Sequence, residues 1–249
     1  MSTRVWWLVT AALLGLLGFA FIAPGGAQEN RVPEAQSEPP TWRISFTPEF
    51  WAAGLAGRVG VGGRVTDVDL SFGDIVDQFD IGVMGLLEGR RTPWVLRTDV
   101  FYVNLSDEAG GITVNQEQLM LQPEVGRTVV SRPWGDVDIL AGVRYWHLNV
   151  DLTAPPQDLS GGQDWVDATV GAAWRFQPGQ HWHLFAKGDL GGGGAKLTWQ
   201  GHGGAGYDLG RCCTLLAAYR YLDVDYEKDN GLVYDVHLNG PALGVTLRF

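Results

Sequence analysis

The sequence is poor in charged residues, which make up 18% of its 249 positions, against roughly 25% in a typical soluble domain. Bases are the scarcer kind, with 18 Lys and Arg against 28 Asp and Glu, and they form no cluster. A chain with net charge −10 and no basic patch lacks the electrostatic footprint that nucleic acid requires. These shortages argue against a nucleic-acid-binding protein and against an ordinary soluble domain.

Cysteine is equally scarce, and the two copies, Cys212 and Cys213, are adjacent. Neighbouring cysteines do not easily reach relaxed disulfide geometry. Neither a CxxC motif nor metal-ligand spacing is present. The simplest interpretation is a pair of small apolar residues beside a turn. A strained vicinal disulfide and an intermolecular bridge are the alternatives.

Long apolar runs are missing except near the N-terminus, where residues 5–22 carry no charge and follow Arg4. Pro24, two glycines and Ala27 then form a small-residue cleavage site, which predicts a signal peptide over residues 1–27. A permanent anchor helix is the alternative, because a run of this length could just span a bilayer. Residues 28–41 are polar and contain three prolines, and we expect a disordered periplasmic linker there. Cleavage would leave a formal charge of −11, from 17 bases and 28 acids.

Glycine and tryptophan are abundant, with 35 and 11 copies. After Trp42 the chain shows no long amphipathic helix, and segments with strand periodicity follow one another instead. Tight breaks alternate with longer or more polar ones such as 55–79, which is typical of an antiparallel meander whose two ends face different compartments. The ten predicted strands lie near residues 42–54, 80–90, 94–105, 112–130, 137–153, 164–176, 182–190, 196–208, 214–227 and 233–249.

Each predicted strand has one apolar and one polar face. The polar faces carry charges of both signs at mid-strand, whereas aromatic residues gather near strand ends on the apolar faces, as in the girdles of a lipid-facing surface. This pattern favours a barrel in a membrane over a secreted sandwich. We expect the charged residues to fill the lumen as a network of eight acids and five bases: Glu49, Glu88, Arg97, Asp99, Glu124, Asp138, Arg144, Asp167, Arg175, Lys187, Asp189, Asp208 and Arg220.

Within a strand, alternate residues share one face, and we call each such set of positions a parity. In several strands the parity that is apolar along most of the strand becomes polar at one end. His147, Asn149 and Asp151 take over after Tyr145, and Asp223 and Asp225 do so after another tyrosine. A charge on the lipid face near the midplane costs roughly 2–4 kcal/mol. These strands are therefore predicted to project past the membrane into water.

The layout resembles the small outer-membrane β-barrel proteins of Gram-negative bacteria over residues 42–249. It shares their signal peptide, their meander of amphipathic strands and a final phenylalanine. Residues 68–106, with a V-D-x-S-F-x-D loop before a hairpin, are similar to an uncharacterised subset of that group. The resemblance implies residence in the outer membrane, contact with its lipid, and recognition by the barrel assembly machinery through the alternating residues of "GVTLRF": Leu243, Val245, Leu247 and Phe249.

We therefore expect an all-β protein, a transmembrane antiparallel up-and-down barrel of ten strands. Eight strands is the alternative if residues 182–208 or the first segment do not pair. Pro241 lacks a ladder donor and makes local pairing doubtful at that point. No motif for a cofactor is present, and the oligomeric state stays open.

The sequence favours a structural or surface-interaction role with a filled lumen and no turnover. A narrow porin-like channel is the first alternative. The second is a hydrolase that uses acids and a histidine at the external rim: Asp223, Asp225, Asp235 and His237. The acidic loop 66–80 is expected to be solvated or to cap the barrel. Calcium binding is a minor alternative, because its Asp-x-Asp-x-Ser spacing meets Gly73 one position late.

Overall fold

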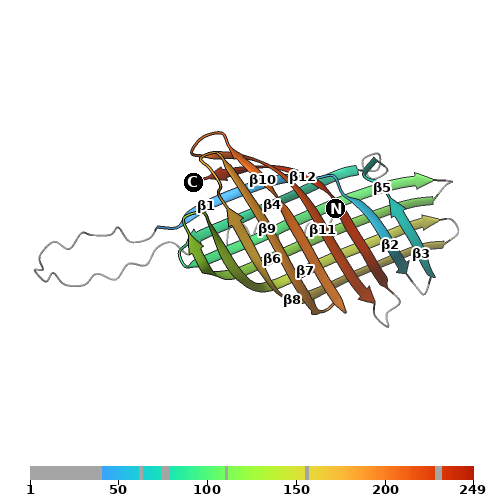
Figure 1. Cartoon of the computed structure of the whole chain (residues 1–249). Helices are drawn as coiled ribbons and strands as arrows, with labels where there is room; N and C mark the ends of the chain where they lie inside the picture. The colour runs from blue at the N-terminus through green and yellow to red at the C-terminus, as the bar shows by residue number, and fades with distance from the viewer. Residues whose placement is uncertain (1–40, 62–63, 74–78, 110–111, 155–156, 228–231) are drawn as a thin grey trace, which may run out of the picture. The chain divides into compact units, whose positions relative to one another are not determined.

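The computed structural model describes residues 41–61, 64–73, 79–109, 112–154, 157–227 and 232–249. Within these ranges, twelve strands form one antiparallel sheet, and ten of them close into a barrel through the pairing of β1 with β12 (Figure 1). The strands are β1 (Arg43–Trp51), β2 (Gly54–Val61), β3 (Arg64–Leu70), β4 (Phe79–Arg91), β5 (Trp94–Ala109), β6 (Ile112–Arg132), β7 (Gly135–Ala154), β8 (Gln157–Phe176), β9 (Trp182–Gly193), β10 (Leu197–Asp208), β11 (Cys213–Glu227) and β12 (Val233–Arg248). No helix among the described residues is both long and apolar enough to cross a bilayer. The prediction of a ten-stranded barrel is confirmed.

The segment 55–79 was expected to be a loop, and this expectation is wrong. Its first part forms β2 and β3, which lie outside the ten-strand closure: β2 pairs with β12, and β3 pairs with β2. Glycines at 54, 57 and 60 lower the strand propensity of β2 and conceal its periodicity. The ladder with β12 supplies the order that local propensity does not. A helical turn begins at Phe72, and residues 74–78 of the predicted acidic loop lie outside the described residues.

Two further predicted loops are also largely strand. Residues 106–109 continue β5, and most of 154–162 belongs to β7 and β8. Their Gly, Ser, Asp and Pro content indicates turns. Each strand nevertheless extends because its neighbour extends beside it, and paired backbone groups outweigh weak local propensity. The register is continuous from Ala109 opposite Ile112 and from Ala154 opposite Gln157.

A break between β1 and β2 coincides with the proline in β12. The lower part of β12 pairs with β1 up to Ala242, and its upper part pairs with β2 from Asn239. Pro241 has no N–H to donate across the break, and its carbonyl accepts a bond of 2.9 Å from the amide of Ala52. Gly240 allows this close approach, since a Cβ at that position would lie 2.0 Å from the carbonyl oxygen of Ala52. The proline is thus accommodated at a bulge-like junction.

The two ends of the barrel differ in their turns. The tight links that follow β4, β6, β8 and β10 all lie at the end where β1 starts and β12 finishes. Short turns mark the periplasmic end of an outer-membrane barrel, and long external structures mark the other end. We therefore call these the periplasmic and the external ends.

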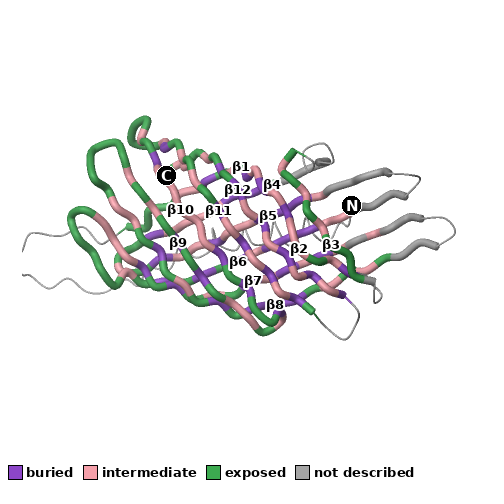
Figure 2. The backbone as a smooth tube through the Cα atoms, turned by 45° about the vertical axis from the view of Figure 1, so that its right-hand side comes forward, coloured by how far each residue is buried: buried purple, intermediate pink, exposed green. Residues whose placement is uncertain are grey.

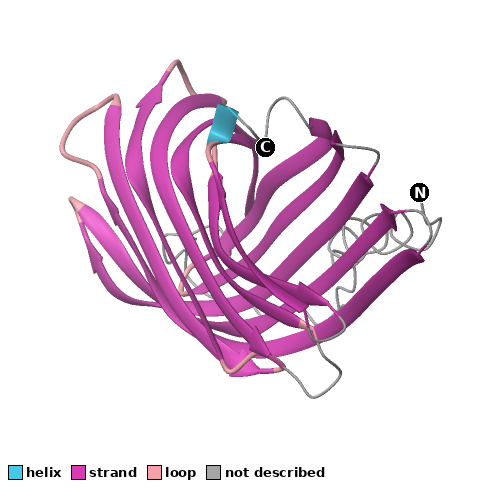
Figure 3. Cartoon of the chain, turned by 90° about the vertical axis from the view of Figure 1, so that its right-hand side faces the viewer, coloured by secondary structure: helices cyan, strands magenta, loops and turns pink. Residues whose placement is uncertain are grey.

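Side-chain polarity inverts along the barrel wall. In β7, Val143 is exposed on the outer face while Arg144 is fully buried inside. Towards the external end the same inward parity carries Trp146 and Leu148, both buried, and the outward parity carries His147. Figure 2 shows the alternation of buried and exposed positions along the strands, and Figure 3 shows the ring that they form.

The periplasmic half is consequently polar inside and apolar outside, as a surface in contact with lipid requires. Its exposed apolar side chains come from almost every strand of the barrel: Ile44, Phe50, Trp94, Val125, Ile139, Val143, Val170, Trp174, Trp182, Leu184, Leu190, Leu215, Leu243 and Val245. We call this surface the apolar belt.

The longest strands extend well beyond what a membrane needs. A transmembrane strand requires about 9–11 residues, whereas β6 has 21 and β7 and β8 have 20 each. The excess, about ten residues at ~3.4 Å each, carries the strand some 30 Å further along its own direction. The predicted projection into water would therefore be formed by extended strands.

The apolar belt predicts a position-dependent cost for charge on β8. Val170→Arg places a guanidinium in the belt, and we expect the free energy of unfolding in lipid vesicles to fall by about 2–4 kcal/mol. Ser160→Arg is the matched control, because it lies on the same strand and the same outward parity but beyond the belt. It should leave the free energy unchanged. Equal effects of the two substitutions in urea titrations would show that the belt does not contact lipid.

Candidate functional site: the lumen

A network of polar side chains crosses the lumen at mid-height. Arg144 on β7 forms a fully buried ion pair with Asp189 on β9, and its Nε donates to Gln122 Oε1 at 3.0 Å. Gln200 Nε2 on β10 donates to Gln122 and to Asp189, both at 2.8 Å. We call the connected set the central network: Asp99, Gln122, Glu124, Arg144, Lys187, Asp189, Gln200 and Arg220.

These contacts join strands that are not neighbours in the sheet. Arg220 on β11 donates to Asp99 on β5 at 2.7 Å, although five strands separate them on one side of the ring and three on the other. Lys187 on β9 lies 2.7 Å from Glu124 on β6. Such bonds exist only if the side chains meet inside the barrel. The central network therefore ties opposite walls together and fills the middle of the lumen.

A second polar network lies nearer the periplasmic end. Glu88 on β4 binds Arg97 at 3.0 Å and both Arg90 and Arg175 at 3.2 Å. Arg90 also donates to Asp138 on β7 at 2.8 and 3.2 Å in a bidentate arrangement. Asp138 is buried, so this arrangement compensates the charge that its burial would otherwise leave unpaired.

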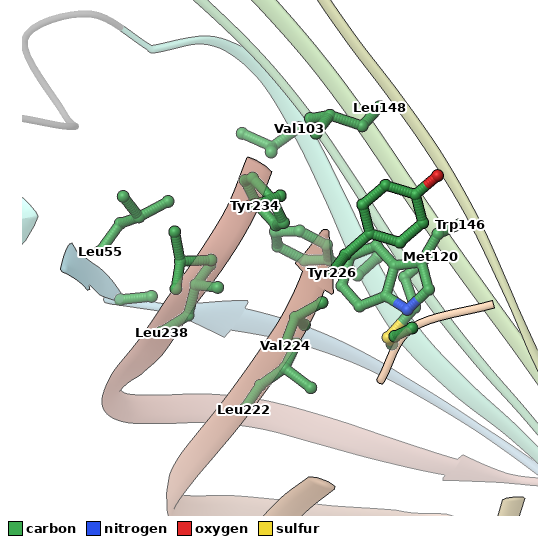
Figure 4. Packing of buried hydrophobic residues seen from close by; sticks show 14 of the residues in the cluster. Leu55, Val103, Met120, Trp146, Leu148, Leu222, Val224, Tyr226, Tyr234 and Leu238 are labelled. Atoms are coloured by element: carbon green, nitrogen blue, oxygen red, sulfur yellow. The ribbon is translucent and has the colours of Figure 1, made fainter. Parts of the chain in front are cut away.

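An apolar cluster closes the lumen on the external side of the central network. Trp165 stacks on Tyr226 with ring centroids 4.2 Å apart and on Trp146 at 5.6 Å. Figure 4 shows Trp146 and Tyr226 among the buried apolar side chains. Tyr234 on β12 reaches Gln118 on β6 with its hydroxyl, at 3.3 Å. We call the cluster the apolar plug: Trp51, Ala53, Leu55, Met84, Phe101, Val103, Met120, Trp146, Leu148, Trp165, Ala195, Leu222, Val224, Tyr226, Leu232, Tyr234, Val236, Leu238 and Ala242.

The plug joins two sheet layers. One layer is the upper part of β5 to β8, and the other is formed by β11, β12, β2 and β3. Val59 on β2 and Val68 on β3 pack against its margin. Above the membrane the wall thus has a dry interior and a polar exterior, as a soluble β-protein has. The two strands outside the closure supply part of this core.

The structure places ten of the thirteen predicted lumen charges in one or other network. The other three have different surroundings. Asp167 accepts bonds from the amides of Gly194 and Ala195, at 3.0 and 2.7 Å, and so holds the β9–β10 hairpin. Asp208 pairs with Arg248 near the periplasmic mouth at 2.8 Å. The carboxylate of Glu49 forms no ion pair within the described residues.

Sequence reasoning missed the uncharged members of the site. Gln122 and Gln200 connect four charged residues, and both lie on the polar parity of their strands. Both glutamines are absent from the predicted lumen residues because that prediction considered charged side chains only. It also missed Arg90, and it missed the plug, although the inward parity from Leu222 to Tyr226 turns apolar where the outward parity turns polar. That paired inversion is the signal that could have located the plug.

The proposed rim hydrolase residues lie on the outer face of the external half. Asp223 is opposite His237, and Asp225 is opposite Asp235, in the ladder between β11 and β12. Asp235 pairs with Arg58 on β2, and His237 stacks on a tyrosine ring. Partial burial raises the pKa of the Asp223 carboxyl, and the charge of His237 acts in the opposite direction. The four side chains thus lie on a wet outer wall rather than in a cavity.

The predicted calcium spacing falls on a strand. Asp67 and Asp69 belong to β3, where Asp67 is opposite Arg58. An extended ladder does not provide the curved loop that surrounds a calcium ion. The geometry of these two residues gives the metal alternative no support.

Cys212 and Cys213 lie at the β10–β11 turn, as expected for small residues beside a turn. Their sulfur atoms are 3.4 Å apart, and both thiols are free.

No family model matches the sequence, and no curated protein matches it significantly. Among solved structures, the outer membrane protease OmpT from Escherichia coli superposes with a TM-score of 0.52 at 9% identity, over 85% of this chain and 97% of OmpT. The translocator domain of the autotransporter NalP from Neisseria meningitidis gives 0.41 at 15% identity, over 86% and 90%. The attachment invasion locus protein Ail of Yersinia pestis gives 0.36 at 12%, over 85% and 100%. At these identities the similarity concerns the fold alone, and the OmpT superposition carries it.

A closed antiparallel meander with an apolar belt and a polar lumen defines a class of protein. The chain has the fold of the bacterial outer-membrane β-barrel proteins, with the apolar belt around the outside of its closed ten-stranded barrel. Within this class, its distinguishing feature is a lumen filled at two levels, by the central network and by the apolar plug.

The buried ion pairs predict a large cost when one partner is neutralised. Asp189→Asn leaves Arg144 and Lys187 without their shared carboxylate, and we expect the free energy of unfolding to fall by about 3–5 kcal/mol. The matched control is Asp235→Asn, which removes one partner of an exposed pair on the outer wall and should have no measurable effect. Urea titration of the folded fraction on unheated gels measures both. Similar midpoints for the two variants would contradict a stabilising central network.

Proposed function

We propose that the protein is a non-conducting outer-membrane barrel that holds a rigid external β-structure at the cell surface. The observation that carries this proposal is the apolar plug, which lies across the lumen above the central network. A solute would have to displace stacked rings such as Trp165 and Tyr226 and also break buried ion pairs. Small barrels of this kind use side chains to fill their interior.

The external half supports a role in surface interaction. Its core is apolar and its wall is polar, so it needs neither lipid nor a bound ligand to bury its hydrophobic residues. Outward-facing acids give the wall an acidic character, among them Asp164, Asp223 and Asp225. A rigid acidic surface held clear of the membrane suits reversible contact with cationic partners.

The two alternatives have less support. A channel requires a continuous polar path, and the plug interrupts it. A hydrolase requires its groups to meet around a substrate, whereas Asp225 and His237 lie on a convex outer wall. OmpT is a protease, but its similarity to this chain concerns the fold.

We also propose how the protein is exported and assembled. Residues 1–27 act as the signal peptide and residues 28–41 as a linker; apart from Thr41, both segments lie outside the described residues. Leu243, Val245, Leu247 and Phe249 share the outward parity of β12. We propose that this edge is the signal that the barrel assembly machinery reads before β12 closes on β1.

Conductance measurements test the plugged lumen. Purified protein that migrates faster on gels when unheated than when boiled, and is therefore a closed barrel, is added to a planar lipid bilayer. We expect no stepwise current at any voltage that the bilayer tolerates. Resolved conductance steps from the folded protein would refute the non-conducting role and favour the channel.

A second measurement tests the hydrolase alternative. Wild-type protein should show no turnover of peptide or phospholipid substrates. Activity that His237→Ala and Asp225→Ala abolish, with gel mobility intact, would establish the enzyme instead.

A further inference from the structure

The periplasmic end of the lumen opens into a cavity of about 790 Å³. Its wall comes from the first residues of β1, the last of β12, and the turns after β6, β8 and β10. A second cavity of about 180 Å³ shares Glu88, Arg175 and His183 with it and reaches Lys187 in the central network. Together they form a funnel that we call the periplasmic vestibule. The central network and the apolar plug lie beyond its inner end.

The vestibule is lined by an excess of arginine. Side chains of three acids face the larger cavity, namely Glu88, Asp136 and Asp208. Positive side chains therefore outnumber negative ones in this wall. The arginines are six: Arg43, Arg90, Arg132, Arg175, Arg211 and Arg248.

Three of these six arginines form ion pairs with acidic side chains. Arg90 and Arg175 neutralise Glu88 and Asp138, and Arg248 binds Asp208. The other three, Arg43, Arg132 and Arg211, are exposed and form no ion pair with any described residue. They stand at three separate places around the mouth, on β1, at the end of β6 and in the β10–β11 turn.

This arrangement runs against the charge of the whole protein. The chain carries a net charge of −10, so a small anion is repelled from most of its surface. Because arginines outnumber acids in this concave wall, the electrostatic field inside the funnel raises the local concentration of anions. Guanidinium groups bind phosphate through paired N–H donors. A cavity of this volume falls within the range of about 300–1,000 Å³ that small-molecule sites occupy.

We infer that the vestibule is a binding site for a phosphate-bearing anion that enters from the periplasmic side. Arg132 and Arg211 capture the ligand at the mouth, and Arg43 contacts it from the first strand. The paired arginines deeper in the funnel neutralise its acids, so the unpaired arginines set the sign of its charge. Because the funnel ends at the central network, the site retains a ligand and does not transmit it. This inference is independent of the surface role proposed above.

The test uses the mature protein, without residues 1–27, in detergent, and gel mobility verifies that it is folded. Inorganic pyrophosphate is titrated by calorimetry in low salt and again in 0.5 M NaCl. We expect saturable one-site binding that weakens in high salt, since ionic screening shortens the range of exposed charges. A parallel titration uses dihexanoyl phosphatidic acid below its micellar concentration, so that a soluble phosphate and a lipid headgroup are distinguished.

The variant pair isolates the vestibule from general charge effects. Arg132→Gln with Arg211→Gln removes two lining charges, and the association constant should fall at least about tenfold, since hydrogen bonds to charged groups are strong. Arg91→Gln with Arg127→Gln removes two exposed arginines from the same end of the barrel that do not line the cavity. This control should bind as the wild-type protein does.

Binding of pyrophosphate identifies a soluble ligand. Binding of the lipid analogue alone, with the same loss in the lining variant, identifies a headgroup, and both results support the site. Absence of saturable binding for both probes, or equal losses in the two double variants, overturns it. Neither outcome depends on whether the barrel conducts.

Discussion

The buried ion pair of Arg144 on β7 with Asp189 on β9, inside the lumen, is the interaction on which the rest of the barrel depends. A barrel in lipid must turn its apolar side chains outward. Because alternate side chains point to opposite faces of a strand, the polar ones then face the lumen. Unpaired charges in a narrow lumen would each cost several kcal/mol. The chain limits this cost by placing opposite charges and glutamines so that most of them meet inside the lumen, several from strands that are not neighbours. The partners meet only if all ten strands keep their register, and for this reason the network also specifies the closure.

The same reasoning explains why the apolar plug lies where it does. Above the belt the wall is in contact with water. Apolar side chains on its outer face would there form an exposed hydrophobic surface that favours aggregation. Once the outward side chains become polar, as His147 and Asp223 do, the inward ones are free to become apolar. Trp146, Trp165 and Tyr226 use this freedom and pack as in a soluble core. The change of environment from lipid to water thus dictates the change of lumen content from ionic to aromatic. It also makes use of β2 and β3, whose inward residues complete the core where the membrane strands alone leave it open.

The strand order and the facing of most side chains could be predicted from sequence because both depend on a period of two, which is local. Residues such as Val143 and Arg144 differ in parity and therefore in environment, whatever their partners are. Pairings across the lumen could not be predicted in this way: nothing near Arg220 in the sequence indicates that Asp99, 121 positions away, lies 2.7 Å from it. The strand character of residues 54–61 was hidden for a related reason. Their glycine-rich sequence is neutral between loop and strand, and the ladder with β12 decides it. Asp167 shows a third limit, since its parity is that of the lumen while its partners are the backbone amides of a hairpin.

In the proposed orientation, the two ends of the molecule present opposite charges to two compartments, and this asymmetry limits what the protein can do. The acidic external wall disfavours anions at the cell surface, whereas the unpaired arginines at the periplasmic mouth favour them. A pore with such ends would be selective for neither sign along its whole length. A barrel closed in the middle has no such conflict, because each end then meets its own partners independently. The plug therefore accounts for the filled lumen and also for the separation of charge, since it allows Arg132 and Asp223 to act on different solutions without sharing a path between them.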